Sequence, residues 1–287
     1  MITTTNNPSP QPEYTHEPIT VSSQSFGTGW DASISTLRNS RTDCFKPNED
    51  RVIVDPVRQS VVIADGITRT KADDGTYPLR SPSAEVAQLF CETVSAAIAA
   101  TEKMSQPALR EIIAEGNRVI AQYNRDHVPV VDYAQRDLAG IAAITGIVDN
   151  DRLWIASIAD CVCLSANSLR VDRIAWEMTS QASEEYKRIG EIEARRTLRN
   201  NPNSKYAYGA FTGEETALRF VFLRCFPIGY AQRLVFASDG LLELAQRTPT
   251  IFRGSTPSQI MAAACQLERE TKATDDKTIV VLDRKPR

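Results

Sequence analysis

Apolar residues gather in short runs that end at turn-forming residues, a pattern typical of β-strands. The runs RVIVD (51–55) and SVVIAD (60–65) are joined by PVRQ and predict a hairpin. AGIAAITGIV (139–148) and RLWIASIADCVCLS (152–165) predict a second hairpin around the turn DND. Further strands are predicted in WDASIST (30–36), LRVDRIAWEM (169–178), LRFVFLRCF (218–226), RLVFASDG (233–240) and KTIVVLDR (277–284).

A second pattern, with apolar residues three and four apart, predicts helices between these strands. Residues 81–103 and 105–126 each begin with a serine just before a proline-containing first turn, a frequent helix start. Residues 256–270 begin with Thr-Pro and have the same spacing. Residues 183–201 are highly charged with few apolar anchors, which favours a surface helix or a mobile flap.

Most strand connections are short, so the sheets are expected to be mainly antiparallel. Residues 1–28 are rich in Thr, Asn, Pro, Ser and Gln, and their composition predicts a disordered leader. No fixed-period repeat or internal linker follows, so residues 29–287 are expected to form one α+β domain.

The composition of the chain limits which classes of partner and cellular location are expected. The net charge is −3 with both signs mixed along the chain, so no nucleic-acid partner is expected. No apolar stretch is long enough to span a membrane, and the N-terminal residues lack the features of a secretory signal. The expectation is a cytoplasmic protein whose six cysteines, none in a CxxC pair, are reduced.

The chain has only two histidines, His16 and His127. His16 lies in the polar leader, so a Ser-His-Asp triad, a histidine-ligated zinc or a phosphohistidine carrier would depend on His127 almost alone. These classes are therefore disfavoured, and His127 is read as a solvated residue after a helix.

Acidic residues recur at the ends of the predicted strands. A hairpin that turns about Val57 places Glu49 opposite Asp65, at one edge of the sheet. Asp239 follows one strand and Asp275 precedes another, so they share an edge if those strands pair. Asp50 and Asp276 adjoin these acids, and Asp160 interrupts the run 152–165.

Several carboxylates buried together raise one another's pKa unless a cation neutralises them. A cluster of oxygen ligands without His or Cys is best suited to Mg²⁺ or Mn²⁺. The alternative is that each Asp-Gly pair is an ordinary turn, with the aspartate closing an Asx turn and the glycine at positive φ.

The chain resembles the metal-dependent serine/threonine phosphatases of the PP2C (PPM) type through five segments, which stand in the family's order with near-family spacing over residues 30–283. Those segments are NEDR (48–51), VVIADG (61–66), GIAAITGIV…RLWIASIADCVCL (140–164), RLVFASDGLLEL (233–244) and TDDKTIVVL (274–282).

The resemblance implies a central β-sandwich of two mainly antiparallel sheets flanked by α-helices, with a dinuclear Mn²⁺/Mg²⁺ site at one edge. Asp65 would bridge the two ions, the Gly66 carbonyl would bind one, and Asp239 and Asp275 the other. Glu49 and Asp50 would hold ion-bound waters or complete the coordination shell. Asp160 would help to hold a third, weaker ion, and the insert around 183–205 would be the flap.

The implied reaction is hydrolysis of phosphoserine and phosphothreonine in proteins by a hydroxide that bridges the two ions. Asp65, Glu49 and Asp239 are the catalytic candidates. No protein nucleophile is needed, in agreement with the shortage of histidine.

The sequence departs from the family in several places. The Asp-Gly of VVIADG continues as ITRT, without the family's usual histidine, and Thr68, Arg69 or a metal-bound water are the candidate substitutes for a proton donor. The family's phosphate-binding arginine is Phe45 here, so Lys46 or Arg41 are the candidate phosphate ligands. Asp276 stands where an asparagine is common.

These departures leave alternatives open. One is a phosphatase-like regulatory or binding module with weak or no turnover. Another is a metallohydrolase that acts on a small phosphorylated metabolite.

Overall fold

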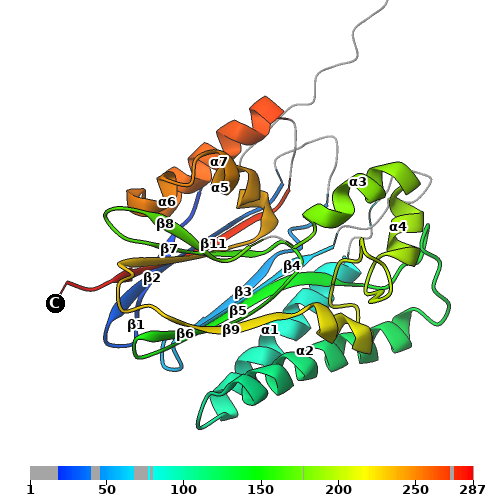
Figure 1. The fold of residues 1–287 in the computed structure, drawn as a ribbon, viewed down its shortest axis with the longest axis horizontal. Coiled ribbons are helices and arrows are strands. Elements are labelled where there is room, and N and C mark those ends of the chain that lie inside the picture. Colours follow the sequence, from blue (N-terminus) through cyan, green and yellow to red (C-terminus); the bar gives the residue numbers. More distant parts are fainter. Residues whose placement is uncertain are drawn as a thin grey trace, which may run out of the picture.

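The computed structural model describes residues 19–39, 46–67, 77, 80–176, 178–271 and 275–286. Two β-sheets pack face to face, with α1 and α2 on the outer face of one and α5, α6 and α7 on the outer face of the other (Figure 1). All strand pairings within the sheets are antiparallel. The expected α+β sandwich is confirmed.

Strands are numbered in chain order, and each sheet combines strands that are distant in the sequence. The six-stranded sheet has the order β1 (Ser22–Phe26), β2 (Trp30–Leu37), β11 (Lys277–Arg284), β10 (Arg233–Ala237), β7 (Val162–Ala166) and β8 (Val171–Ala175). The five-stranded sheet has the order β3 (Arg51–Asp55), β4 (Ser60–Gly66), β5 (Ile141–Asp149), β6 (Arg152–Ile158) and β9 (Phe222–Pro227).

The helices pack on the sheets or project from one end of the sandwich. Ser81 and Ser105 are the N-caps of the two long helices, and each side chain accepts a hydrogen bond from the helix backbone. The helices are α1 (Pro82–Ala100), α2 (Gln106–His127), α3 (Ser180–Ile189), α4 (Glu191–Thr197), α5 (Leu242–Arg247), α6 (Ile251–Gly254) and α7 (Pro257–Thr271), with 3₁₀ turns at Glu215–Phe220 and Asp239–Leu241.

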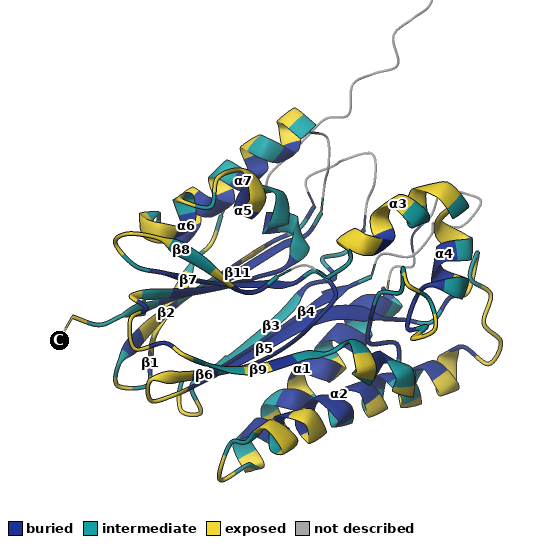
Figure 2. Ribbon diagram, viewed as in Figure 1, coloured by how far each residue is buried: buried dark blue, intermediate teal, exposed yellow. Residues whose placement is uncertain are grey.

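Strands with a continuous apolar run are buried on both faces. In β4, Val61 and Ile63 face the core between the sheets, whereas Val62 and Ala64 pack under α1 and α2. β11 is similar, with Val280 in the central core and Ile279 against the helices on the other side. Figure 2 shows both sheets as largely buried. A strand covered on both faces needs apolar residues at every position, which explains the lack of alternation.

Three expectations need correction. The last part of the predicted disordered leader forms a strand, β1. Its side chains are mostly exposed and polar, and its backbone is held by pairing with β2. The first hairpin pairs Arg51 with Ala64, which is one residue away from the predicted register. The predicted strand 152–165 is two strands, β6 and β7, which belong to different sheets and are separated at Ala159, where φ is 65°.

Two further segments differ in part from the elements predicted for them. Of residues 183–201, most lie in two short helices, α3 and α4, which are joined at Gly190, and the last four follow α4. Residues 218–226 begin as a 3₁₀ turn before β9. In the part of the chain that the structure describes, no helix is both long enough and apolar enough to cross a bilayer.

Candidate active site

Acidic residues from both sheets meet at one end of the sandwich. β4 and β10 end there, at Gly66 and Ala237, and β3, β7 and β11 begin there. Asp65 is the second-last residue of β4, and Asp239 follows β10 by two residues. β10 pairs with β11, with Ala237 opposite Ile279, so the condition under which Asp239 and Asp275 share this end is met.

Asp65 and Asp239 form the centre of the cluster, and each carboxyl group affects the pKa of the other. Burial raises the pKa of Asp65 well above its usual value, and the negative charges of Asp239 and Asp50 raise it further. Burial likewise raises the pKa of Asp239, followed by repulsion from Asp275 and Asp160. Both carboxyls therefore lie where a positive charge is needed to keep them ionised.

Asp50 connects the two sheets. It precedes β3 of the five-stranded sheet, and its Oδ2 accepts a hydrogen bond of 2.7 Å from Ser238 Oγ at the end of β10. Ser238 Oγ in turn accepts from the Thr278 backbone N–H at 2.9 Å. Burial and the charge of Asp276 raise the pKa of Asp50 to about 7. The corrected hairpin register, extended by one pair, places Asp50 rather than Glu49 opposite Asp65.

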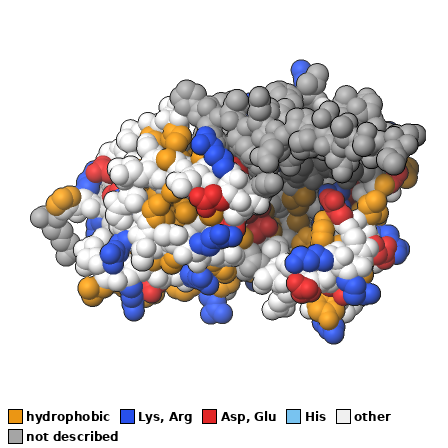
Figure 3. All heavy atoms as spheres, turned by 90° about the horizontal axis from the view of Figure 1, so that it is seen from above, with side chains coloured by type: hydrophobic (Ala, Val, Ile, Leu, Met, Phe, Trp, Pro, Cys, Tyr) orange, Lys and Arg blue, Asp and Glu red, His pale blue; other side chains and the backbone are white. Residues whose placement is uncertain are grey.

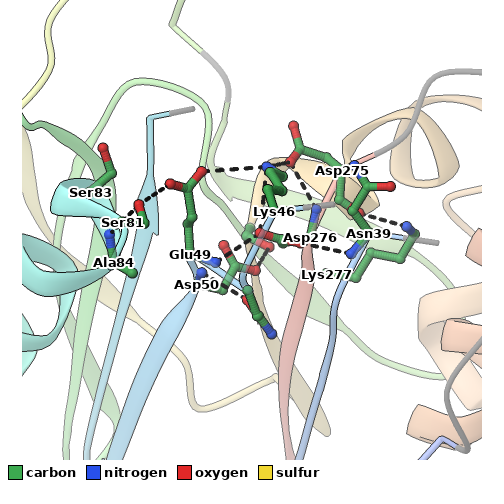
Figure 4. Close-up of polar contacts among 12 residues, drawn as sticks. Asn39, Lys46, Glu49, Asp50, Ser81, Ser83, Ala84, Asp275, Asp276 and Lys277 are labelled. Atoms are coloured by element: carbon green, nitrogen blue, oxygen red, sulfur yellow. Dashed lines mark hydrogen bonds and ion pairs between the residues drawn. The ribbon is translucent and has the colours of Figure 1, made fainter. Parts of the chain in front are cut away.

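Asp276 is a second connection between the sheets. Its Oδ1 accepts from the Asn39 N–H at 2.7 Å, and its Oδ2 accepts from the Glu49 N–H at 2.8 Å (Figure 4). Both oxygens therefore fix the backbone of other segments. A carboxylate can accept from two N–H groups at once, whereas an asparagine at this position offers only one oxygen. This gives a physical reason for the aspartate at a position where asparagine is common in the family.

Glu49 is fully buried and held by side chains from outside the predicted motif. Its Oε1 accepts from Ser81 Oγ, which also caps α1 (Figure 4), and from Tyr77 Oη at 2.6 Å. Sequence reasoning missed Tyr77 entirely and recognised Ser81 only as a helix start. Nothing in the local sequence around either residue signals a partner near position 49.

Lys46 lies between the two acidic segments. Its ammonium is 3.1 Å from Asp275 Oδ1 and 3.5 Å from both Glu49 Oε2 and Asp276 Oδ2. The residue is 4% exposed, and the pKa of its ammonium is raised by the three carboxylates against the opposing effect of burial. Arg41, the other candidate phosphate ligand, lies outside the described residues, as do Phe45, Thr68 and Arg69.

Gly66 and Gly240, which follow Asp65 and Asp239, are required by close packing. A Cβ on Gly66 would lie 2.7 Å from Glu49 Cβ, and one on Gly240 would lie 2.0 Å from the Asp276 carbonyl oxygen. Neither glycine is among the described residues that have positive φ. The alternative of two ordinary turns with a left-handed glycine is therefore wrong for both pairs.

The donor set suits a hard divalent cation. Asp50 Oδ1 and Asp239 Oδ1 are buried and have no hydrogen-bond partner among the described residues. Buried carboxylate oxygens without a donor are costly, and Mn²⁺ or Mg²⁺ would satisfy them. Within the described ranges, no three Asp, Glu, His or Cys side chains already stand in a ligand arrangement. Asp275 is instead turned to Lys46.

A cavity of about 430 Å³ lies beside the cluster, between the sheet edge and helices α3 and α4. Ile67 and Asp160 line it on the site's side, and Arg195 and Arg199 on the helix side. Arg199 donates two hydrogen bonds of 2.7 Å to Asp137, which fixes α4 against the body of the molecule. Asp160 thus lies at the crossover between the sheets and on the wall of this cavity. On the face seen in Figure 3, acidic and basic side chains are interspersed.

Solved structures with a similar fold include serine/threonine phosphatases. The serine/threonine phosphatase PstP/Ppp of Mycobacterium tuberculosis matches with a TM-score of 0.62 and 19% identity, over 89% of this chain and 99% of that one. The PstP catalytic domain in complex with 2 manganese ions gives 0.63 and 18%, over 90% and 99%. Stp1 of Staphylococcus aureus gives 0.60 and 15%, over 92% and 98%.

The fold is that of the PP2C-type serine/threonine phosphatases. No protein-family model and no curated protein matches the sequence. The fold expected from the five short segments is thus confirmed by the three-dimensional arrangement, at sequence identities below one in five.

Proposed function

We propose that this chain is a metal-dependent phosphomonoester hydrolase that dephosphorylates phosphoserine and phosphothreonine in proteins. The observation that carries the proposal is the meeting of Asp65 and Asp239 at one end of a PP2C-type sandwich. Their pKa values are raised by burial and by neighbouring acids, and Asp239 Oδ1 has no partner among the described residues. The manganese ions bound by a protein of the same fold support the choice of metal.

The residues have distinct proposed roles. Asp65, the Gly66 carbonyl, Asp239 and Asp275 would hold two Mn²⁺ or Mg²⁺ ions. When bound, such ions lower the pKa of water toward neutrality and polarise phosphoryl oxygens for in-line attack. Asp65, Asp239 and Glu49 are the proposed catalytic residues.

Neighbouring hydroxyl groups position the carboxylates of Asp50 and Glu49. Ser238 holds Asp50 Oδ2, while Tyr77 and Ser81 hold Glu49 Oε1, so both carboxylates are oriented before any ligand arrives. Such preorganisation lowers the cost of assembling the site around an ion and its waters. Asp160 is the proposed ligand of a third, weaker ion, and Lys46 and Arg41 are the proposed phosphate ligands.

Hydrolysis of p-nitrophenyl phosphate and of a phosphothreonine peptide in Mn²⁺ or Mg²⁺ tests the proposal. The wild-type protein should hydrolyse both, and EDTA should abolish the reaction. The Asp239→Asn variant is the control. Wild-type activity no higher than that of this variant would reject the proposal.

The second candidate is a phosphatase-like regulatory or binding module. The ion pair of Lys46 with Asp275 favours it, because that carboxylate is engaged by the protein itself. Calorimetry that detects Mn²⁺ binding without any turnover would select it. Preferential turnover of phosphorylated small molecules over peptides in a substrate panel would select a metabolite hydrolase instead.

A further inference from the structure

The ammonium of Lys46 is in direct contact with carboxylates of both acidic segments, 49–50 and 275–276. Figure 4 shows its ammonium between Glu49 on one side and Asp275 and Asp276 on the other. All three carboxylates lie within 3.5 Å of the ammonium, and its side chain is 5% exposed. A buried ammonium with these partners acts on the cluster as a bound cation does.

The three carboxylates differ in what else holds them. Asp276 is fixed by two backbone N–H groups and Glu49 by two hydroxyls. The Asp275 side chain is 40% exposed, and its Oδ1 accepts both from Lys46 and, at 2.8 Å, from the Asp276 N–H. Asp275 is therefore the carboxylate most able to change partners. It is also one of the proposed metal ligands.

We propose that Lys46 is a built-in counter-cation which competes with a divalent metal ion for Asp275, so that the metal must displace the ammonium from this carboxylate. The inference deepens the proposed function, because it rests on the same acidic cluster. Lys46 then has a role in metal binding that precedes its proposed role as a phosphate ligand. Glu49 and Asp276 remain close enough to retain the ammonium once Asp275 has turned to the metal.

The competition makes the two sides of the cluster unequal. Around Asp65 and Asp239 the dominant electrostatic neighbours are other carboxylates. An ion held by Asp65 and the Gly66 carbonyl does not need Asp275, whereas the ion held by Asp239 and Asp275 must also overcome repulsion from Lys46. Metal loading is therefore expected in two steps, with the Asp275-dependent ion binding more weakly.

Titration calorimetry of the full chain with MnCl₂ tests the inference. Replacement by Lys46→Met removes the competing charge and keeps a side chain of similar length. We expect its weaker Mn²⁺ site to tighten by about tenfold or more, within the usual range of coupling between sites. Lys46→Arg keeps the charge and should bind like the wild type. An unchanged or weaker affinity in Lys46→Met would overturn the inference.

A second measurement needs no variant of Lys46 and covers the case in which Lys46→Met does not fold. Lysine acetylation by a water-soluble reagent, read by mass spectrometry, should modify Lys46 slowly without metal. Saturating Mn²⁺ should accelerate it several-fold relative to Lys103, an exposed internal reference. An Asp275→Asn variant should lose this acceleration. Equal Lys46 reactivity with and without Mn²⁺ would overturn the inference.

Both readouts are independent of catalysis. Tighter Mn²⁺ binding in Lys46→Met with no hydrolysis by any variant would support the inference and reject the phosphatase proposal. If the wild type hydrolyses phosphate esters and Lys46→Met binds Mn²⁺ with the wild-type affinity, the phosphatase proposal is supported and the inference about Lys46 is rejected.

Discussion

Individual carboxylates in this chain are in environments that oppose their charge. Asp65 and Asp239 lie close together at the ends of β4 and β10, and burial together with the charges of neighbouring carboxylates raises the pKa of each. Such an arrangement lowers the stability of the metal-free fold, and proteins retain it where the strain serves a site. Stability and function should therefore respond in opposite directions when one charge is removed.

Asp239→Asn is expected to raise the stability of the metal-free protein and to abolish function. It removes one of two charges that repel, so the unfolding midpoint in EDTA should rise by roughly 2 °C or more, since about 1 kcal/mol shifts a protein of this size by a few degrees. Phosphatase activity in Mn²⁺ should fall by about 100-fold or more. Glu102→Gln, at an exposed acid, is the control and should change neither quantity. A lower midpoint in EDTA would contradict the repulsion.

The same acids predict how metal-free stability depends on pH. The pKa of folded Asp50 is raised to about 7, and those of Asp65 and Asp239 are also raised, above the unfolded value near 3.8. Protonation therefore favours the folded state. Their contribution is fully present below pH about 4 and is lost as pH rises through the folded pKa values.

Denaturant titrations in EDTA between pH 5 and 8 measure this effect. The free energy of unfolding should decrease with increasing pH, and the decrease should be smaller in Asp50→Asn. Surface acids such as Glu185 and Glu193 have lowered pKa values and titrate below this window, so they do not mask the trend. A flat or rising profile for the wild type would argue against a strained cluster.

At the scale of strands and turns, the Asp-Gly pairs place their acids by close packing. Gly240 lies against the backbone of the segment before β11, so its lack of a side chain sets the distance between Asp239 and the Asp275–Asp276 pair. The strand ends alone do not fix this spacing. The same holds for Gly66 against Glu49.

Gly240→Ala should destabilise the protein by about 1–3 kcal/mol, the usual cost of overpacking, because the new Cβ would fall 2.0 Å from the Asp276 carbonyl oxygen. It should also weaken Mn²⁺ binding by displacing Asp239 from Asp275. Gly254→Ala is the matched control, since a Cβ there has nothing within 4 Å. Urea denaturation and calorimetry measure both effects. Equal stabilities of the two variants would contradict the packing argument.

Sequence patterns predicted most of the strands and helices but not their exact pairing. The β3–β4 hairpin was expected from two apolar runs, yet its register differed by one residue, because apolar runs buried on both faces carry no alternation to fix it. With the observed register, Asp50 lies opposite Asp65, where Glu49 was expected. The break at Ala159 was missed for the same reason, since apolar residues continue into the other sheet.

The sequence predicted the acidic residues of the candidate site but not the side chains that hydrogen-bond to them. Asp65, Asp239 and Asp275 were expected at one edge, and their strands do end or begin there. Tyr77 and Ser81, which hold Glu49, and Ser238, which holds Asp50, come from segments that only the folded chain brings close. Hydrogen bonds between distant segments leave no local sequence pattern. The roles of the acids stay predictions until metal binding is measured.

In the whole molecule, the acidic cluster lies where the two sheets are joined. Glu49 and Asp50 precede β3 of the five-stranded sheet, whereas Ser238 follows β10 and Asp276 precedes β11 of the six-stranded one. The sheets otherwise meet through the apolar core around Ile63, Phe236 and Val280. A metal ion bound by Asp65 of one sheet and Asp239 of the other would therefore add a link between the layers.

Mn²⁺ should consequently stabilise the entire fold and not only the site. At a metal concentration about 100 times the dissociation constant, a single site adds about 2.7 kcal/mol. Thermal unfolding with increasing MnCl₂ measures the shift, and Asp239→Asn should lose most of it. Hydrogen exchange at the ends of β4 and β10 should slow together in the wild type, because one ligand then restrains both layers. Slower exchange in β4 alone would show that the ion is held by one sheet and does not link the sandwich.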